Sequence, residues 1–255
     1  MSCYKASGKI YLRNKSLANQ PFLHIGNASA VINTEVEETT VPDFTNVAGG
    51  NACVDKIINK VTLGLNIYDF KAENLAKAVQ GTSADGDDSA ITDELIRAFA
   101  DELIPTAKLI DTTVAPVVTN QAGSTTYVKD TDYTVEDAGI RVIAGSSLAT
   151  AVAAGSGTPK SILLKIDYTP KGHNVVEALI SAGDQYEVLM ITQNRANSGK
   201  FGRWNLYAVD FGPTASLNVV QREFANFELL GEVVSDSTRG DGTTESSYFN
   251  IQQEV

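Results

Sequence analysis

The sequence predicts a mainly β protein, and three observations carry this prediction. Twenty Gly and many Thr, Val and Ser favour strands and turns over a helical bundle. From Val61 to Tyr68, apolar residues alternate with polar or small ones, the period expected of a strand with one buried face. Short apolar runs separated by turn-forming residues then recur through the last two thirds of the chain. A length of 255 residues suits one elaborated β domain or two small ones.

The first third predicts two strands and a long connection. Gly8–Arg13 is expected to form a short strand, and Ala28–Glu38 a longer one. The longer strand turns acidic towards its end, at Glu35, Glu37 and Glu38. Thr39–Lys56 has few apolar residues and no clear period, which predicts a long functional loop or an extended arm. Its turn-forming residues are Pro42, Gly49, Gly50 and Asn51.

Residues 60–81 predict a strand that runs straight into a helix. Asp69 occupies the position expected of an N-cap, and Gly81 that of a C-cap. Between them, Leu75 and Val79 recur at helical spacing. The segment carries no reactive group, so it contributes packing and surface.

The middle third opens with a polar break, residues 82–92, which predicts a boundary. Asp93–Ile104 is ambiguous. Its apolar residues Leu95, Phe99 and Leu103 fall at i, i+4 and i+8, which favours a helix that ends before Pro105. Short strands are the alternative. Val114–Tyr168 predicts several strands, including a hairpin that turns at Ala138-Gly139. A flexible turn is expected at Ala151–Pro159.

The last third also predicts mostly strands. The expected strands are Tyr186–Asn194, Gly202–Phe211, Ala215–Glu223 and Phe224–Val234. An exposed loop over Ser235–Ser247 is expected to follow, and Tyr248–Val255 to close the chain as an edge strand.

Charge and cysteine content exclude several classes of protein. The net charge of −11 argues against a nucleic-acid reader, which needs a basic face. The charge is uneven, because residues 1–81 carry eight basic and seven acidic groups whereas residues 82–170 carry six and thirteen. Cys3 and Cys53 have no metal-type spacing, so neither a metal site nor a disulfide framework is expected. The chain opens without a basic segment and long apolar run, so we expect a soluble, non-exported protein.

Catalysis has no candidate in the sequence. The two histidines, His24 and His173, lack the neighbours of a hydrolase triad, and no G-x-S-x-G motif occurs. The phosphate-loop-like stretch Ala154–Ser161 has Pro159, which lacks an N–H, where a glycine is required. The acidic run Asp85–Asp88 lacks the glycine and glutamate of a calcium loop. We therefore expect neither an enzyme nor a cofactor.

Taken together, the segments resemble the major tail protein (tail tube protein) of long-tailed bacteriophages. In chain order, those that carry the resemblance are GKIYL (8–12), FLHIGN (22–27), TEVEETTVPD (34–43), NIYDFKAENLAKAVQG (66–81), VKDTDYTVEDAGIRVIAGSSLA (128–149), FELLGEVVSD (227–236) and YFNI (248–251). The resemblance covers most of the chain through the order of its pieces and fits residues 82–112 least well.

The resemblance implies a β-sandwich or barrel-like tail-tube core with one flanking helix and long loops. Residues 1–81 and 171–255 would form this core, and residues 82–170 a strand-rich elaboration. The resemblance also implies a structural virion protein that assembles in the host cytoplasm into stacked hexameric rings, the tube through which DNA is ejected. An Ig-like β-sandwich decoration or adhesion module of a virion or cell surface is the alternative.

The implied partners are copies of the chain itself, the tape-measure protein and the tail-terminator and initiator proteins. DNA would pass through the lumen without specific binding, and no membrane is involved. Glu35, Glu37 and Glu38 become candidates near the lumen or the joint between rings, with a solvated outer face as the alternative. The segment containing Pro42, Gly49, Gly50 and Asn51 becomes the candidate arm between rings.

Overall fold

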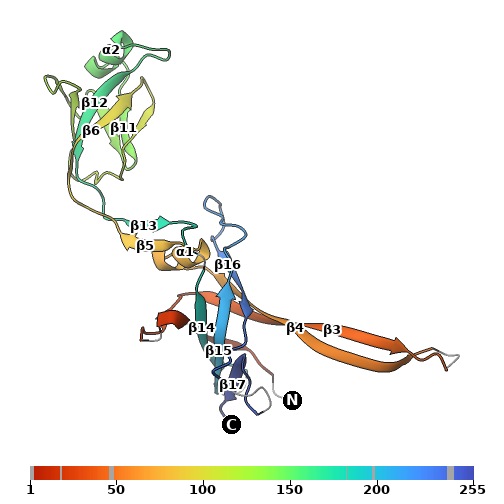
Figure 1. The fold of residues 1–255 in the computed structure, drawn as a ribbon. Coiled ribbons are helices and arrows are strands. Elements are labelled where there is room, and N and C mark those ends of the chain that lie inside the picture. Colours follow the sequence, from red (N-terminus) through yellow and green to blue (C-terminus); the bar gives the residue numbers. More distant parts are fainter. Residues whose placement is uncertain (1–2, 18, 46–48, 182, 197–198, 240–243) are drawn as a thin grey trace. The chain divides into compact units, whose positions relative to one another are not determined.

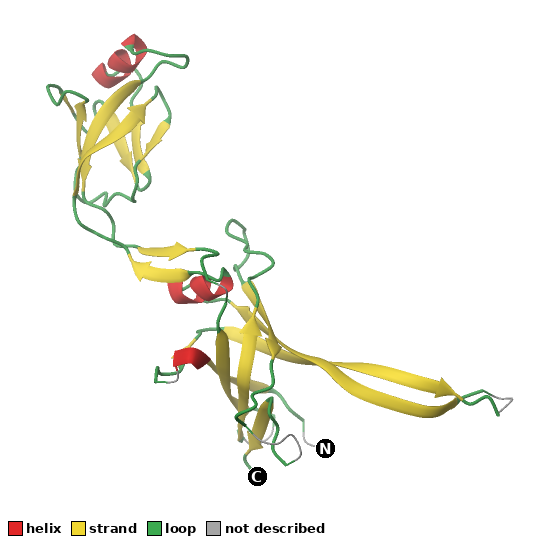
Figure 2. Ribbon diagram, viewed as in Figure 1, coloured by secondary structure: helices red, strands yellow, loops and turns green. Residues whose placement is uncertain are grey.

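The computed structural model describes residues 3–17, 19–45, 49–181, 183–196, 199–239 and 244–255. The predicted mainly β class is confirmed: strands dominate the described chain, and they pair in antiparallel sheets (Figures 1 and 2). The chain divides into two compact units. Unit 1 comprises Met1–Ser83 with Val176–Val255, and unit 2 comprises Ala84–Val175.

Unit 1 is built on an eight-stranded sheet. Its order is β2-β1-β14-β15-β16-β4-β3, and β17 pairs with β15 beside this path. The strands are β1 (Ala6–Asn14), β2 (Leu23–His24), β3 (Ala28–Pro42), β4 (Asn51–Ile67), β14 (Gln185–Asn194), β15 (Phe201–Phe211), β16 (Phe227–Val233) and β17 (Phe249–Gln253). A short 3-10 helix, η1 (Lys15–Leu17), follows β1.

The core of unit 1 forms where alternate side chains point to one face of this sheet. Along β4 the predicted alternation from Val61 to Ile67 is confirmed, because every second residue is buried. The same alternation runs through β16, whose buried residues include Phe227 and Leu229. Ile10 and Leu12 of β1 join them in one cluster. The described residues of unit 1 therefore share one apolar core.

Helix α1 (Ala72–Ala78) follows β4 and has different caps from those predicted. The N-cap is Lys71, whose side chain makes no capping hydrogen bond, and the carboxylate of Asp69 forms an ion pair with Lys71 at 3.0 Å. At the other end the N–H of Gly81 donates to Ala76 O at 2.8 Å, as in a Schellman motif. Gln80, with φ of 47°, takes the left-handed position that usually belongs to glycine.

Gly81 is required for a different reason from the one predicted. A Cβ at this position would overlap the carbonyl oxygen of Glu177, on strand β13 (Asn174–Glu177). β13 pairs with β5 (Thr82–Asp85) in a two-stranded sheet at the points where the chain leaves unit 1 and returns to it.

Unit 2 has its own core and two small sheets. One has the order β6-β12-β8-β9 and the other β10-β11-β7. The strands are β6 (Ile91–Ala98), β7 (Leu103–Pro105), β8 (Val117–Asn120), β9 (Thr126–Tyr127), β10 (Tyr133–Glu136), β11 (Gly139–Val142) and β12 (Ile162–Tyr168). The predicted hairpin around Ala138-Gly139 is confirmed as the β10–β11 pair.

Helix α2 (Ser147–Ala154) completes the core of unit 2 with Leu148 and Val152. Its start is fixed by the buried Asp132, whose carboxylate accepts hydrogen bonds from Ser147 Oγ at 2.7 Å and from Val128 N at 2.8 Å. These hydrogen bonds lower the pKa of Asp132, and the bond from Val128 N has the largest effect.

Three local predictions are wrong. Asp93–Ile104 forms strands in place of the favoured helix. Ile96 and Ala98 are buried whereas Leu95 and Arg97 are exposed, which is the period of two of a strand. Ala151–Pro159 is not wholly a turn, since α2 continues to Ala154. Ala215–Glu223 forms no strand, and the loop leaves Val219 and Val220 exposed.

Gly81→Ala should lower the free energy of unfolding of unit 1 by about 2 kcal/mol or more, because the added methyl overlaps backbone that has no room to move. Gly212→Ala is the control, since the nearest atom to its Cβ would be Leu230 O at 3.9 Å. We expect a change within about 0.5 kcal/mol for this control. Urea unfolding followed by the fluorescence of the single tryptophan, Trp204, measures both, and equal stability of the two variants would contradict the clash.

Asp236 predicts an acid-sensitive fold in unit 1. This buried carboxylate accepts from Thr238 Oγ1 at 2.7 Å and pairs with Lys15 at 3.1 Å. The hydrogen bonds from Thr238, with that cation, lower the pKa of Asp236 to about 2. A lowered pKa stabilises the fold above the unfolded value of about 4, and this stabilisation is lost as the pH falls towards 2.

Asp236→Asn should therefore destabilise unit 1 at pH 7, and its deficit relative to wild type should shrink as the pH falls from about 4 to about 2. Urea unfolding at several pH values measures the difference. Glu223→Gln, at an exposed position, is the matched control. A deficit that is the same at pH 7 and pH 3 would show that the charge of Asp236 is not what stabilises unit 1.

Candidate functional site

The two histidines and the acidic run of the sequence are all among the described residues. No group of three or more His, Cys, Asp or Glu side chains in the described part of the chain is arranged to hold a metal ion. His24 lies against the ring of Tyr11, with centroids 5.2 Å apart. His173 lies 3.6 Å from the carboxylate of Asp88, and Asp87 pairs with Lys108. The acidic run of the sequence is thus placed beside Lys108 and the imidazole of His173 in unit 2.

The most distinctive feature of unit 1 is a two-stranded arm. We define the arm as residues 35–60: the parts of β3 and β4 that lie beyond Val61, the first buried residue of β4 in chain order, and the connection between them. In Figure 1 the two ribbons leave the sheet together and continue without a third strand. Apart from the half-buried Asp43, every described residue of the arm is exposed.

The arm corrects the prediction for residues 39–56. A loop or extended arm was the expectation, but β3 continues to Pro42 and β4 begins at Asn51, so most of this range is a β-hairpin. Gly49 and Gly50 lie in the turn with φ of 76° and 133°, and residues 46–48 fall outside the described chain. β-branched residues on both sides of the Gly-Gly-Asn turn were the available signal. Because both faces of the ribbon are exposed, no apolar period marks it.

The strand register assigns each arm residue to a face. Residues directly opposite each other in an antiparallel pair project to the same side. Val36, Glu38 and Thr40 pair with Ile58, Lys56 and Val54, and we call this the core-side face because it continues the buried face of β3. Glu35, Glu37, Thr39 and Val41 pair with Lys60, Ile57, Asp55 and Cys53 on the outer face. A bulge between Glu35 and Val36 shifts the pairing by one residue of β4.

Glu35, Glu37 and Glu38 therefore do not form one cluster. Glu35 and Glu37 lie on the outer face, whereas Glu38 lies on the core-side face and pairs with Lys56 at 3.1 Å. None of them ends a strand, because β3 extends four residues beyond Glu38. The acidic end expected of the second strand is in fact the half of the arm nearer the core.

Apolar side chains are exposed on both faces of the arm. Their exposed fractions are 49% for Val36, 51% for Val41, 49% for Val54, 60% for Ile57 and 64% for Ile58. At the tip, Phe44 is 88% exposed. The N–H of Asp43 donates to Gly50 O at 2.9 Å, which closes the strands behind this ring.

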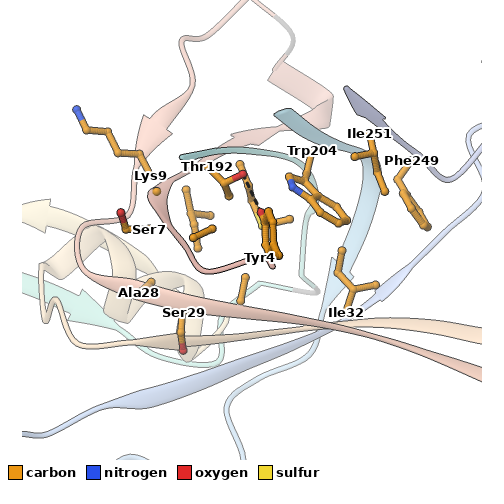
Figure 3. Close-up of a pocket in the computed structure, with 15 residues that line it drawn as sticks. Tyr4, Ser7, Lys9, Ala28, Ser29, Ile32, Thr192, Trp204, Phe249 and Ile251 are labelled. Carbon is orange, nitrogen blue, oxygen red and sulfur yellow. Dashed lines mark hydrogen bonds between the residues drawn. The ribbon is translucent and has the colours of Figure 1, made fainter. Parts of the chain in front are cut away.

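A second feature of unit 1 is a cavity of about 650 Å³ between β1 and β3, shown in Figure 3. β1 pairs with β14 and β2, and β3 with β4, so the described strands form no ladder across the gap. Small residues line the two strands: Ala6, Ser7 and Gly8 on β1, and Ala28, Ser29 and Ala30 on β3. Larger apolar side chains complete the lining, including Tyr4, Ile32, Trp204, Phe249 and Ile251 (Figure 3). Sequence reasoning missed this cavity.

The described part of the chain contains no helix with the length and apolar character needed to cross a membrane.

Comparison with protein-family models gives a match over residues 3–252 to the family described as "Protein of unknown function UCP028589". The comparison with curated proteins gives no match.

Because a two-stranded hairpin in water is marginally stable, we expect amides of 51–58 in the free subunit to exchange at least about tenfold faster than those of 61–67. The two segments belong to the same strand and differ in whether the core covers them. Hydrogen exchange read out by mass spectrometry compares them directly. Equal protection along the whole of β4 would contradict the assignment of the arm as unsupported ribbon.

Proposed function

Since the chain belongs to the UCP028589 family, whose description assigns no activity, we propose its function from its own surfaces. The chain is a structural virion protein that self-assembles into stacked hexameric rings, the tail tube through which phage DNA is ejected. The observation that carries this proposal is the arm, which exposes apolar side chains on both faces and at its tip.

The arm is poorly suited to a protein that works as a monomer. Fully burying a Val or Ile side chain contributes roughly 1.5–3 kcal/mol, and each of the five such residues along the ribbon, about half exposed, would gain roughly half of that. A partner that covers both faces would gain this stabilisation and would support a hairpin that has no third strand. Exposed apolar side chains gathered on a ribbon that has no packing of its own favour an interaction site.

Unpaired strand edges support the same proposal. Among the described strands, β3 pairs on one side only, with β4, over its fifteen residues. β17, the strand expected to close the chain at an edge, pairs only with β15. Such edges carry unpaired N–H and C=O groups that can pair with a neighbouring chain. Assembly into a closed ring would use these edges and leave none free.

The resemblance of the sequence to phage tail tube proteins supplies the number of subunits and the role of the lumen. The net charge of −11 suits a conduit for DNA, because carboxylates do not bind phosphates whereas a lysine-lined wall would. An Ig-like decoration or adhesion module, the alternative, would remain a monomer. The state of assembly therefore separates the two proposals.

The purified protein should form rings or tubes, and deletion of residues 42–51 should leave a folded subunit that cannot polymerise. A second variant, Ile57→Thr with Ile58→Thr, removes apolar surface from both faces of the arm and should have the same effect. Negative-stain electron microscopy and light scattering measure assembly, and urea unfolding checks the fold.

The control is Val117→Thr with Val128→Thr, which changes two valines of unit 2 with exposed fractions of 47% and 58%. This variant should assemble as wild type does. Tubes formed normally by the arm variants would exclude the arm as the assembly element. Wild-type protein that stays monomeric, even with an added tail initiator complex, would count against the tube itself.

A further inference from the structure

We infer that the arm tip of one copy docks in the cavity between β1 and β3 of a neighbouring copy, with Phe44 as its anchor. This inference rests on the proposed self-assembly and names the surface that receives the arm.

The cavity has the composition of an aromatic-binding pocket. Its fifteen lining residues include no carboxylate, and its larger side chains apart from Lys9 are apolar or aromatic, among them Met190, Trp204 and Ile251. The hydroxyl of Tyr4 donates to Thr192 Oγ1 at 3.1 Å, which satisfies both groups inside the cavity (Figure 3). A buried aromatic anchor surrounded by a polar rim is the usual anatomy of a protein interface.

The tip is organised in advance to present one aromatic ring. The carboxylate of Asp43 accepts hydrogen bonds from Thr45 N at 2.8 Å and Thr45 Oγ1 at 2.6 Å. Together with the bond from Asp43 N to Gly50 O, these contacts fix the backbone on both sides of Phe44. A side chain that is 88% exposed beside these fixed backbone positions costs less entropy to dock than one on a free segment.

Charge complementarity favours the arm as the occupant. The arm, residues 35–60, carries five carboxylates and two lysines, a net charge of −3. The cavity lies at the basic end of unit 1: Lys9 lines it, Lys5 stands between the lining residues Tyr4 and Ala6, and Lys200 lines the adjoining hollow. Glu254, also at that hollow, already accepts from Phe201 N at 2.9 Å. In Figure 3 the amine of Lys9 points away from the cavity, which places this charge at the rim.

The contact has to form between two copies. The base of β3, from Ala28 to Ile32, lines the cavity, and Pro42 at the end of the arm lies ten residues further along the same strand. A strand rises about 3.3 Å per residue, so the tip lies on the order of 30 Å from its own cavity. The arm tip and the cavity that would receive it are thus different surfaces of one chain. Contacts of this head-to-tail kind generate rings or continuous assemblies.

Two complementary full-length variants test the contact. Ala6→Trp fills the cavity from an exposed position and keeps the arm intact, whereas Phe44→Asp disables the tip and keeps the cavity intact. Each variant alone should stay monomeric, and an equimolar mixture should form a one-to-one dimer in analytical ultracentrifugation. Lys9→Glu should weaken this dimer at low salt and much less at high salt.

The two cysteines give an independent readout. Cys53 pairs with Val41 on the arm, about 10 Å from Phe44 along the strand, and Cys3 adjoins Tyr4 with its carbonyl held by Asn194 Nδ2 at 3.2 Å. A bifunctional maleimide of about that reach should link Cys3 of one copy to Cys53 of the next and give a ladder of multimers. Cys3→Ser and Cys53→Ser should each remove the ladder.

The outcomes separate this inference from the proposed function. A mixture that yields no dimer, from variants that unfold as wild type does, would overturn the contact whether or not wild type assembles. Normal tubes from Ala6→Trp, with none from the deletion of residues 42–51, would keep the tube and reject the cavity as receptor. Links between Cys53 and Cys53 alone would mean that arms pack on each other and would also overturn it.

Discussion

The continuous ladder between β3 and β4 is the constraint on which unit 1 depends. The two strands pair from Ala28 and Ile67 in the core to Pro42 and Asn51 at the end of the arm. The buried half, with Leu63 and Leu65 fully enclosed, is held by the packing of β16 and α1. The exposed half of the ladder has no core packing, so the backbone hydrogen bonds that connect it to the buried half determine its position.

This arrangement ties the two candidate surfaces to each other. The first residues of β3 line the cavity, and the arm tip follows its last residue. One strand therefore contributes to both the cavity and the arm. The bulge between Glu35 and Val36 lies between them and sets which side of β4 joins each face of the arm. Through this one ladder, the core determines both where the arm leaves the subunit and which side chains it presents.

Where a core imposed a period on the sequence, the sequence predicted the structure. Val61–Ile67 alternates because one face of β4 is buried, and the hairpin at Gly139 was predictable because Gly139 has φ of 154°, which side chains disfavour. The helix expected over residues 93–104 is absent because the helical spacing of Leu95, Phe99 and Leu103 arises by chance: they lie in β6, in the connection after it and in β7. The arm has no period because nothing covers it. The cavity draws residues from β1, β3, β14, β15 and β17, which no local pattern connects.

The pairing of β5 with β13 has a consequence for how this chain could have acquired unit 2. Its entry and exit strands are hydrogen-bonded neighbours, so to unit 1 the whole of unit 2 takes the place of a hairpin turn. The closure entropy of a connection grows only slowly with its length, so exchanging such an insertion makes little demand on the host fold. Related chains could therefore gain, lose or replace this module while keeping the same arm and cavity, and a foreign domain whose termini lie close together could be grafted there for display.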